Sequence, residues 1–79
     1  MIIVKEVKYK IVNVLAYNLK RKRKVLGLTQ EELADKANLH RTYIGAIERG
    51  ERNITIKSLS LLARALKAKE YELLLKDGK

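Results

Sequence analysis

At 79 residues, the chain has room for one small domain with a single hydrophobic core. Its 18 Lys and Arg residues against 9 Asp and Glu residues give a net charge of +9, an excess that favours a polyanionic partner such as nucleic acid. The absence of Cys excludes disulfides and thiolate zinc sites, and with a single His we expect no metal, no cofactor and no enzymatic activity.

The N-terminal segment predicts the start of a helix. Strand-favouring residues are frequent in MIIVKEVKYK, but apolar residues also recur at helical spacing over residues 4 to 15. We expect the first helix to begin at about Lys8, after frayed or extended residues, and to end at Gly27. The segment lacks the basic head and apolar stretch of a signal peptide, and no apolar run reaches the roughly 18 residues of a transmembrane helix. We therefore expect a cytoplasmic protein without a membrane partner.

Residues 29 to 50, TQEELADKANLHRTYIGAIERG, have the pattern of two short helices joined by a tight turn. Thr29 is a strong N-cap, and Glu32 three residues later completes a capping box, which predicts a helix over residues 30 to 37. Asn38 supplies the left-handed residue that a tight turn between helices requires.

The second helix of this pair is expected over residues 41 to 49, with Ile44 and Ile47 on its buried side and Gly50 at its end. His40 precedes it at the N-cap, where Ser, Thr or Asp would cap better, so we expect a weak cap or an exposed turn residue. Two such helices around a tight turn form a helix-turn-helix motif, whose second helix lies in a DNA groove.

The C-terminal third predicts two further helices. Thr55 is expected to cap a helix in which apolar residues recur at helical spacing, and a short break over residues 67 to 69 follows it. The apolar residues of the fifth helix would be Tyr71, Leu74 and Leu75. The expected fold is therefore all-α with five helices, in one domain over residues 1 to 79 with its core over about residues 8 to 76.

With these segments in place, the chain resembles the phage repressor and Cro class of helix-turn-helix proteins, which have a lambda-repressor-like fold. The resemblance covers about residues 12 to 75, and the strings that carry it are GLTQEELA, YIGAIERG and SLSLLARAL. Within that class, NLHRTYIGAIERGERNITIKSL is most similar to the controller proteins of bacterial restriction-modification systems. The resemblance implies a homodimer that regulates transcription of its own gene and of the endonuclease gene.

The second helix of the helix-turn-helix is the recognition helix, and we expect the side chains near its N-terminus to contact the DNA bases. Arg41 would form a fork to the O6 and N7 atoms of a guanine, and Thr42 would meet a thymine methyl group or a base acceptor. Tyr43 would stack along a sugar or sense a deformable step, and Ala46 would touch a thymine methyl group. In the alternative, Arg41 contacts only phosphate.

Contacts to the DNA backbone are expected at two places. The resemblance implies a phosphate contact from Gln30 at a helix N-terminus, and a grip on the backbone from the region after the recognition helix. The residues expected to contact the backbone are Thr29, Gln30, Arg49, Arg52, Asn53 and Lys57.

One charged residue lies where the first helix should be apolar. Arg23 comes four residues after Leu19 and three before Leu26, on the apolar stripe, and a charge there needs a partner. The resemblance implies that the partner is Glu48, in a structural salt bridge between the first and third helices.

Apolar residues in the C-terminal half exceed what one small core absorbs, which predicts a homodimer. Two copies related by a two-fold axis would place their recognition helices roughly 34–36 Å apart on palindromic half-sites of a double-stranded operator. In the alternative, all of these residues fit within the monomer. The residues expected at the dimer interface, on the fifth helix and around the start of the fourth, are Ile54, Ile56, Leu61, Tyr71, Leu73, Leu74 and Leu75.

Other functions remain open at this point. A prophage-type repressor or an antitoxin would use the same motif, and a helical protein-interaction adaptor would use only the apolar surface. Activation of transcription would need contact with RNA polymerase, for which the candidates are the acidic residues Glu31, Glu32 and Asp35. The same residues would also complement the helix dipole.

Overall fold

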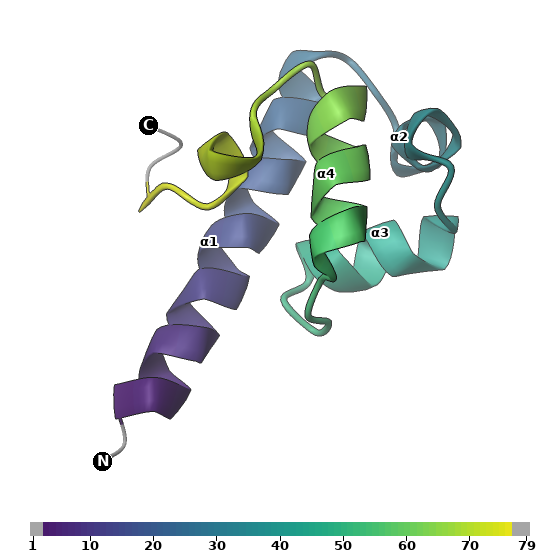
Figure 1. Cartoon of the computed structure of the whole chain (residues 1–79). Coiled ribbons are helices and arrows are strands. Elements are labelled where there is room, and N and C mark those ends of the chain that lie inside the picture. Colours follow the sequence, from purple (N-terminus) through teal and green to yellow (C-terminus); the bar gives the residue numbers. More distant parts are fainter. Residues whose placement is uncertain (1–2, 77–79) are drawn as a thin grey trace.

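The computed structural model describes residues 3–76, which form four α-helices and no strand. The helices are α1 (Ile3–Val25), α2 (Gln30–Ala37), α3 (Arg41–Glu48) and α4 (Ile56–Ala65), followed by the short 3-10 helix η1 (Glu70–Leu73) (Figure 1). The all-α prediction is confirmed for these residues, and the number of α-helices is four rather than five.

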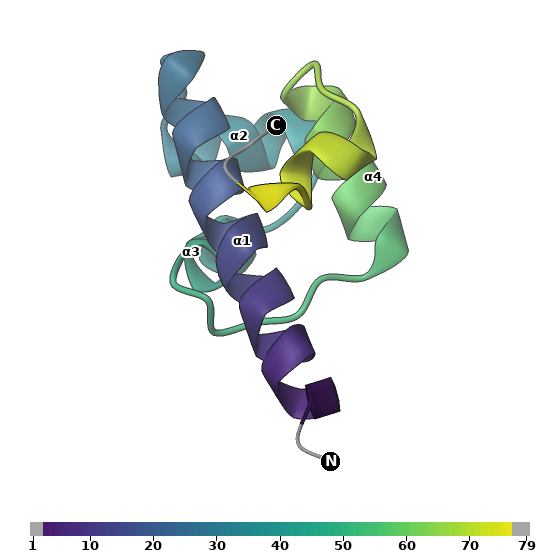
Figure 2. The same cartoon turned by 90° about the vertical axis from the view of Figure 1, so that its left-hand side faces the viewer.

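The helix α1 begins at Ile3, so the prediction of a start near Lys8 is wrong. The apolar residues at helical spacing outweigh the strand preference of the first residues, and no Pro or Gly interrupts the helix before Gly27. Gly27 has a left-handed φ of 72°, the conformation that ends helices without a steric cost. The first turns of α1 extend away from the other helices (Figures 1 and 2).

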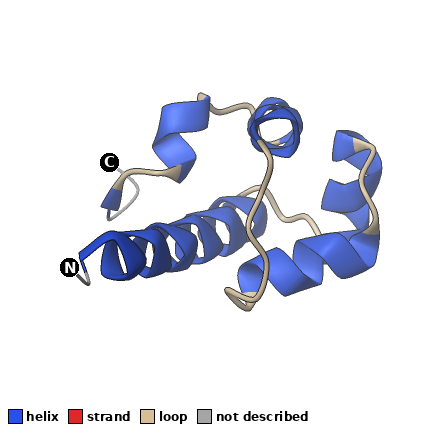
Figure 3. Ribbon diagram, turned by 60° about the horizontal axis from the view of Figure 1, so that its bottom comes forward, coloured by secondary structure: helices blue, strands red, loops and turns tan. Residues whose placement is uncertain are grey.

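The boundaries of α2 follow from its caps. The Thr29 hydroxyl accepts from the Glu32 backbone N at 3.0 Å, and the Glu32 carboxylate accepts from the Thr29 backbone N at 2.8 Å. At the other end, Asn38 has φ 58° and the backbone N of Leu39 donates to the carbonyl of Ala34 at 2.9 Å. The capping box and the left-handed turn are thus confirmed, and they direct the chain into α3 at the angle seen in Figure 3.

The helix α4 is also bounded by local interactions. The Thr55 hydroxyl accepts from the backbone N of Ser58 at 3.0 Å. After Ala65, Lys67 adopts φ 57° and the backbone N of Ala68 donates to the carbonyl of Ala63 at 2.9 Å. A non-Gly residue in this conformation is uncommon, and here it ends the helix and turns the chain back toward α1.

The core is formed by side chains from all four α-helices and η1, and α4 packs mainly against α2. The helix α3 packs against both α1 and α2, and η1 lies against both α1 and α4 (Figure 2). The largest apolar side chains that are fully buried are Leu15, Leu19, Leu33, Ile44, Ile47, Leu62 and Leu73. Because α3 contributes two of them, its position relative to the rest of the domain is fixed by apolar packing.

The predicted fifth helix is replaced by η1 and an irregular segment. The carbonyl groups of Leu73 and Leu75 accept hydrogen bonds from the side-chain amide of Asn18, at 3.0 Å and 2.8 Å. Carbonyl groups at these positions would pair with backbone N–H groups in a continuing α-helix. Here a side chain of α1 supplies hydrogen bonds to these two carbonyl groups.

Candidate nucleic-acid interface

The recognition helix α3 has a buried face and an exposed face. Ile44 and Ile47 are fully buried and hold the helix against the core. Arg41 and Thr42 in its first turn are exposed, and Tyr43 is partly exposed. The apolar packing that holds α3 therefore leaves its first turn accessible to solvent.

The side chains expected to read bases differ in the contacts that they make within the protein. Thr42 shares a 2.7 Å hydrogen bond with the Nδ1 atom of His40, whose own side chain does not cap α3. The ring of Tyr43 packs partly against the core and lies 5.4 Å from the guanidinium of Arg52. Ala46 is partly exposed one turn further along.

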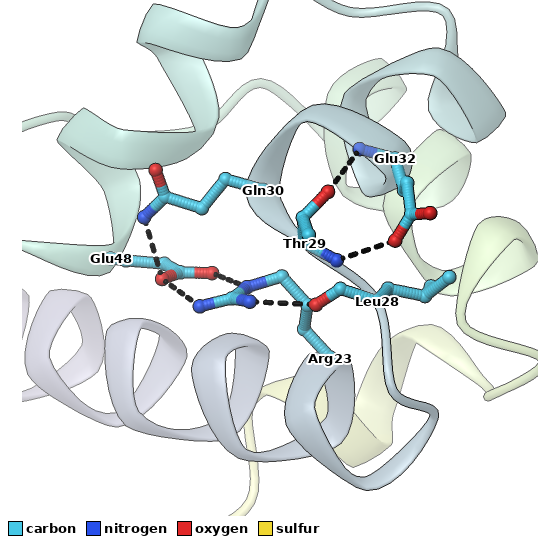
Figure 4. Close-up of polar contacts among 6 residues, drawn as sticks. All are labelled: Arg23, Leu28, Thr29, Gln30, Glu32 and Glu48. Carbon is cyan, nitrogen blue, oxygen red and sulfur yellow. Dashed lines mark hydrogen bonds and ion pairs between the residues drawn. The ribbon is translucent and has the colours of Figure 1, made fainter.

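A charged cluster holds the end of α3 to α1 and to the start of α2 (Figure 4). The Glu48 carboxylate accepts from Nε of Arg23 at 2.6 Å and from Nη2 of Arg23 at 3.0 Å, so the pair is bidentate. The remaining Nη1 atom of Arg23 donates to the carbonyl of Leu28 at 2.7 Å. The side chains of Arg23 and Glu48 are only 9% and 3% exposed, so this is a buried salt bridge with nearly complete hydrogen bonding.

The environment keeps both members of the pair ionised. Burial by itself raises the pKa of the Glu48 carboxyl group, but hydrogen bonds from Arg23 and Gln30 and the charges of Arg23 and Lys20 bring that pKa below its usual value. The hydrogen bond to Glu48 raises the pKa of Arg23. The pair is therefore fully charged at neutral pH.

Gln30, which was expected to contact a DNA phosphate, also belongs to this charged cluster. Its Nε2 atom donates to Glu48 at 3.0 Å, so the side chain crosses from the start of α2 to the end of α3. Gly45 of α3 lies close to the Gln30 side chain and also to that of Arg49. A Cβ atom added to Gly45 would lie 3.2 Å from Nη1 of Arg49 and 3.5 Å from Oε1 of Gln30. Two residues expected to contact the DNA backbone, Gln30 and Arg49, are thus brought together above α3.

The other residues expected to contact the backbone lie around this position. Thr29 is exposed at the start of α2, Lys57 is exposed at the start of α4, and Arg52 and Asn53 are exposed in the loop between α3 and α4. Arg49 forms an exposed ion pair with Glu51 at 3.1 Å. Exposed pairs of this kind contribute little free energy, so Arg49 can exchange its partner for a phosphate.

The residues expected at a dimer interface divide into three groups. Ile56 is 85% exposed, and Tyr71, Leu74 and Leu75 are also exposed, as an interface in the free monomer requires. Ile54 and Leu61 are partly buried against the core. Leu73 is fully buried inside the monomer, so its assignment to the interface is wrong. The 3-10 geometry of η1 turns Leu73 inward between α1 and α4.

Sequence reasoning missed Asn18, which is fully buried and tied to the C-terminal segment. It comes three residues after the buried Leu15 and directly before the buried Leu19. The argument that found Arg23, a polar residue on an apolar stripe, therefore applies to Asn18 as well.

Among the side chains of residues 11–76, no three His, Asp or Glu residues gather where they would hold a metal ion. None of the helices described above combines the length and the apolar character needed to cross a membrane.

A capped helix, a left-handed turn and a second helix with an exposed first turn define the class of helix-turn-helix DNA-binding domains. The profile of the helix-turn-helix family matches residues 19–73. The chain belongs to the helix-turn-helix family.

Its relatives include controller proteins of restriction-modification systems. The control protein C.SmaI of Serratia marcescens is 46% identical over 65 residues, which cover 82% of this chain and 77% of that protein. The controller protein C.AhdI from Aeromonas hydrophila, known from a crystal structure, matches with a TM-score of 0.76 and 37% identity, over 78% of this chain and 94% of that one.

A third relative has been solved on DNA. The controller protein C.Esp1396I, as a tetramer in complex with its natural 35 base-pair operator, matches with a TM-score of 0.74 and 43% identity, over 81% of this chain and 88% of that one. Solved variants of that protein replace an Arg, a Thr and a Tyr at three successive positions.

Proposed function

We propose that this protein is a sequence-specific DNA-binding regulator of transcription that acts as a homodimer, as the controller protein of a bacterial restriction-modification system. The observation that carries the proposal is the exposed first turn of α3, held by buried side chains on the opposite face. The likeness to C.SmaI along most of both chains supports the choice of controller protein within the family.

The proposed base contacts come from the first turn of α3. Arg41 is exposed and long enough to form a fork to the O6 and N7 atoms of guanine in the major groove. Thr42 and Ala46 offer methyl groups for thymine, and Tyr43 lies beside them against the sugar. Arg41, Thr42 and Tyr43 form the only Arg-Thr-Tyr triplet in this chain, which matches the three successive residue types replaced in C.Esp1396I.

The proposed contacts to phosphate surround this reading surface. Gln30 and Thr29 at the start of α2 lie where a positive helix N-terminus attracts phosphate. Arg49 adds positive charge beside Gln30, and Arg52 and Lys57 add exposed positive charge in the loop after α3 and at the start of α4. Asn53 lies in the same loop as Arg52. These contacts position the protein on DNA without reading its sequence, and the net charge of +9 adds a general attraction.

A homodimer would present two recognition helices to palindromic half-sites about one DNA turn apart, roughly 34–36 Å. The proposed interface uses the exposed residues Ile56, Tyr71, Leu74 and Leu75, with Ile54 and Leu61 at its edge. Bound at a promoter in the cytoplasm, the dimer represses by excluding RNA polymerase or activates by contacting it. The exposed acidic residues Glu31, Glu32 and Asp35 of α2 are the proposed contact for activation.

Footprinting on the promoter of the protein's own gene tests the proposal. We expect protection of a palindromic site, with an affinity that falls steeply with salt. If Arg49, Arg52 and Lys57 of both copies each neutralise one phosphate, about six counterions are released and log K falls with log salt at a slope of about −5. Binding of DNA without sequence preference would contradict the proposed function. A salt-insensitive interaction with another protein would instead favour the adaptor.

A further inference from the structure

The side chain of Asn18 is a neutral polar group buried in the centre of α1. Its Nδ2 atom lies 2.8 Å from the carbonyl oxygen of Leu75, 3.0 Å from that of Leu73 and 3.4 Å from that of Glu72. Its Oδ1 atom is buried without a hydrogen-bond partner. Three carbonyl oxygens around one end of the amide require that end to be the nitrogen, because a fourth oxygen there would be repelled.

An amide with an unpartnered oxygen is an unfavourable choice for filling a core. A Leu at this position would bury no polar atom and would match its neighbours Leu15 and Leu19. The amide does something that Leu cannot do, because its two N–H groups bind backbone carbonyl groups of a segment that lies 55 and 57 positions further along the chain. Asn18 therefore determines the path of the C-terminal segment.

That path decides which side chains of the segment face outward. Leu73 enters the core, whereas Tyr71, Leu74 and Leu75 on either side of it are left exposed. A regular helix through these residues would distribute them differently, since Leu74 and Leu75 follow Leu73 at 100° steps around the axis. The hydrogen bonds from Asn18 tie the backbone of this segment to α1 in the observed path.

The exposed residues adjoin a recess on α1. Asn13, Val14, Tyr17 and Lys76 line a cavity of about 240 Å³, open to solvent and mostly apolar. The apolar surface thus continues from the C-terminal segment onto the middle of α1, where Tyr17 is also exposed. Exposed apolar side chains beside a mostly apolar recess form a surface that two copies related by a two-fold axis can bury against each other.

We propose that Asn18 is the positioning residue of the dimer interface, and that the face formed by Tyr17, Tyr71, Leu74 and Leu75 binds a second copy of this chain. This inference rests on the proposed function, which requires two recognition helices in one assembly. Asn18 itself lies inside the monomer and touches no partner. It acts by holding Leu74 and Leu75 where the partner's recess can receive them.

The decisive variant is Asn18→Leu, which keeps the apolar packing of α1 and removes the amide. We expect its thermal unfolding at low concentration to remain close to wild type, while the dissociation constant of the dimer, measured by sedimentation, rises roughly tenfold or more. The matched control is Lys22→Met. It removes a different polar contact between α1 and this segment, a 3.8 Å ion pair between partly exposed Lys22 and Glu72, and should leave the dimer unchanged.

A double-mutant cycle separates positioning from general packing. Leu74→Ser should also weaken the dimer, and combining it with Asn18→Leu should add little, because both remove the same contact. A folded Asn18→Leu protein that dimerises as tightly as wild type would overturn the proposal. If Asn18→Leu fails to fold, Leu74→Ser and Tyr71→Ser decide, since unchanged dimerisation in both would show that this face is not the interface.

The same samples separate this inference from the proposed function. Binding of each variant to a DNA fragment with a single half-site, at protein concentrations where wild type is monomeric, reports on α3 alone. We expect Asn18→Leu to bind the half-site like wild type and to lose affinity for the complete palindrome. Loss of dimerisation with intact half-site binding supports the role of Asn18. A wild-type protein that stays monomeric and still binds a half-site would refute the interface and leave DNA recognition standing.

Discussion

Two polar residues of α1 enter the apolar core, and their surroundings differ. Arg23 has a bidentate partner in Glu48 and a third bond to the carbonyl of Leu28, so it holds the recognition helix. Asn18 binds carbonyl groups through its nitrogen and leaves its oxygen unpartnered, and it holds the C-terminal segment. One helix therefore holds both proposed surfaces, the reading turn of α3 through a buried charge pair and the dimer face through a buried amide.

The largest expected effect is the loss of stability when the buried salt bridge between Arg23 and Glu48 is broken. Arg23→Met leaves the buried Glu48 carboxylate with only Gln30 as a side-chain donor, and we expect a loss of about 3–5 kcal/mol in the free energy of unfolding. Denaturant unfolding at neutral pH measures it. The control is the double variant Arg23→Met with Glu48→Met, which should recover part of the loss because no unpaired charge stays buried. A melting temperature within error of wild type would show that the pair is not stabilising.

The next largest effect separates contacts to the DNA bases from contacts to the DNA backbone. Arg41→Ala removes an exposed side chain, so stability should not change, while operator binding should weaken by about 1–3 kcal/mol if Arg41 reads a guanine. Competition with operators altered at single positions is the measurement, and preference should relax at one position of each half-site. Lys57→Ala is the control, expected to lower affinity equally for all sequences. An equal loss for all sequences with Arg41→Ala would make it a phosphate contact.

The pH dependence of stability is a second test of the salt bridge between Arg23 and Glu48. The pKa of Glu48 in the folded protein lies below its usual value of 4.5, so the unfolded chain binds the proton more readily. The contribution of this group is therefore present above about pH 4.5 and is lost as the pH falls through the folded-state pKa. Glu48→Gln should flatten the acid side of the stability curve measured by denaturant unfolding. The same acid dependence in wild type and variant would assign the effect to other carboxylates.

The smallest effect concerns the packing above α3. Gly45→Ala adds a Cβ atom that meets only the ends of two flexible side chains, Arg49 and Gln30, and both can move. Ala is preferred to Gly within a helix, so we expect stability to rise by up to about 1 kcal/mol. Thermal unfolding of the two proteins measures the difference. A clear loss of stability would mean that the crossing of Gln30 and Arg49 is tightly packed rather than adjustable.

Short-range chemistry made the central part of the fold predictable. The capping box of Thr29, the left-handed Asn38 and the cap of Thr55 act within four residues, so the starts of α2, α3 and α4 follow from adjacent residues. The start of α1 was harder to predict from the sequence, because the same apolar residues suit a strand and a helix. Arg23 could be singled out because a charge on an apolar stripe needs a partner.

The helix-turn-helix, the exposed first turn of α3 and the positive charge that suits DNA follow from residues close together in the sequence, because caps, turns and helical spacing act over a few residues. Contacts between different elements appear only in the folded chain. Arg52 lies against Tyr43, Gln30 joins Glu48, and Asn18 binds a carbonyl group 55 positions further along the chain. These contacts depend on which elements pack side by side, and local spacing does not specify that packing.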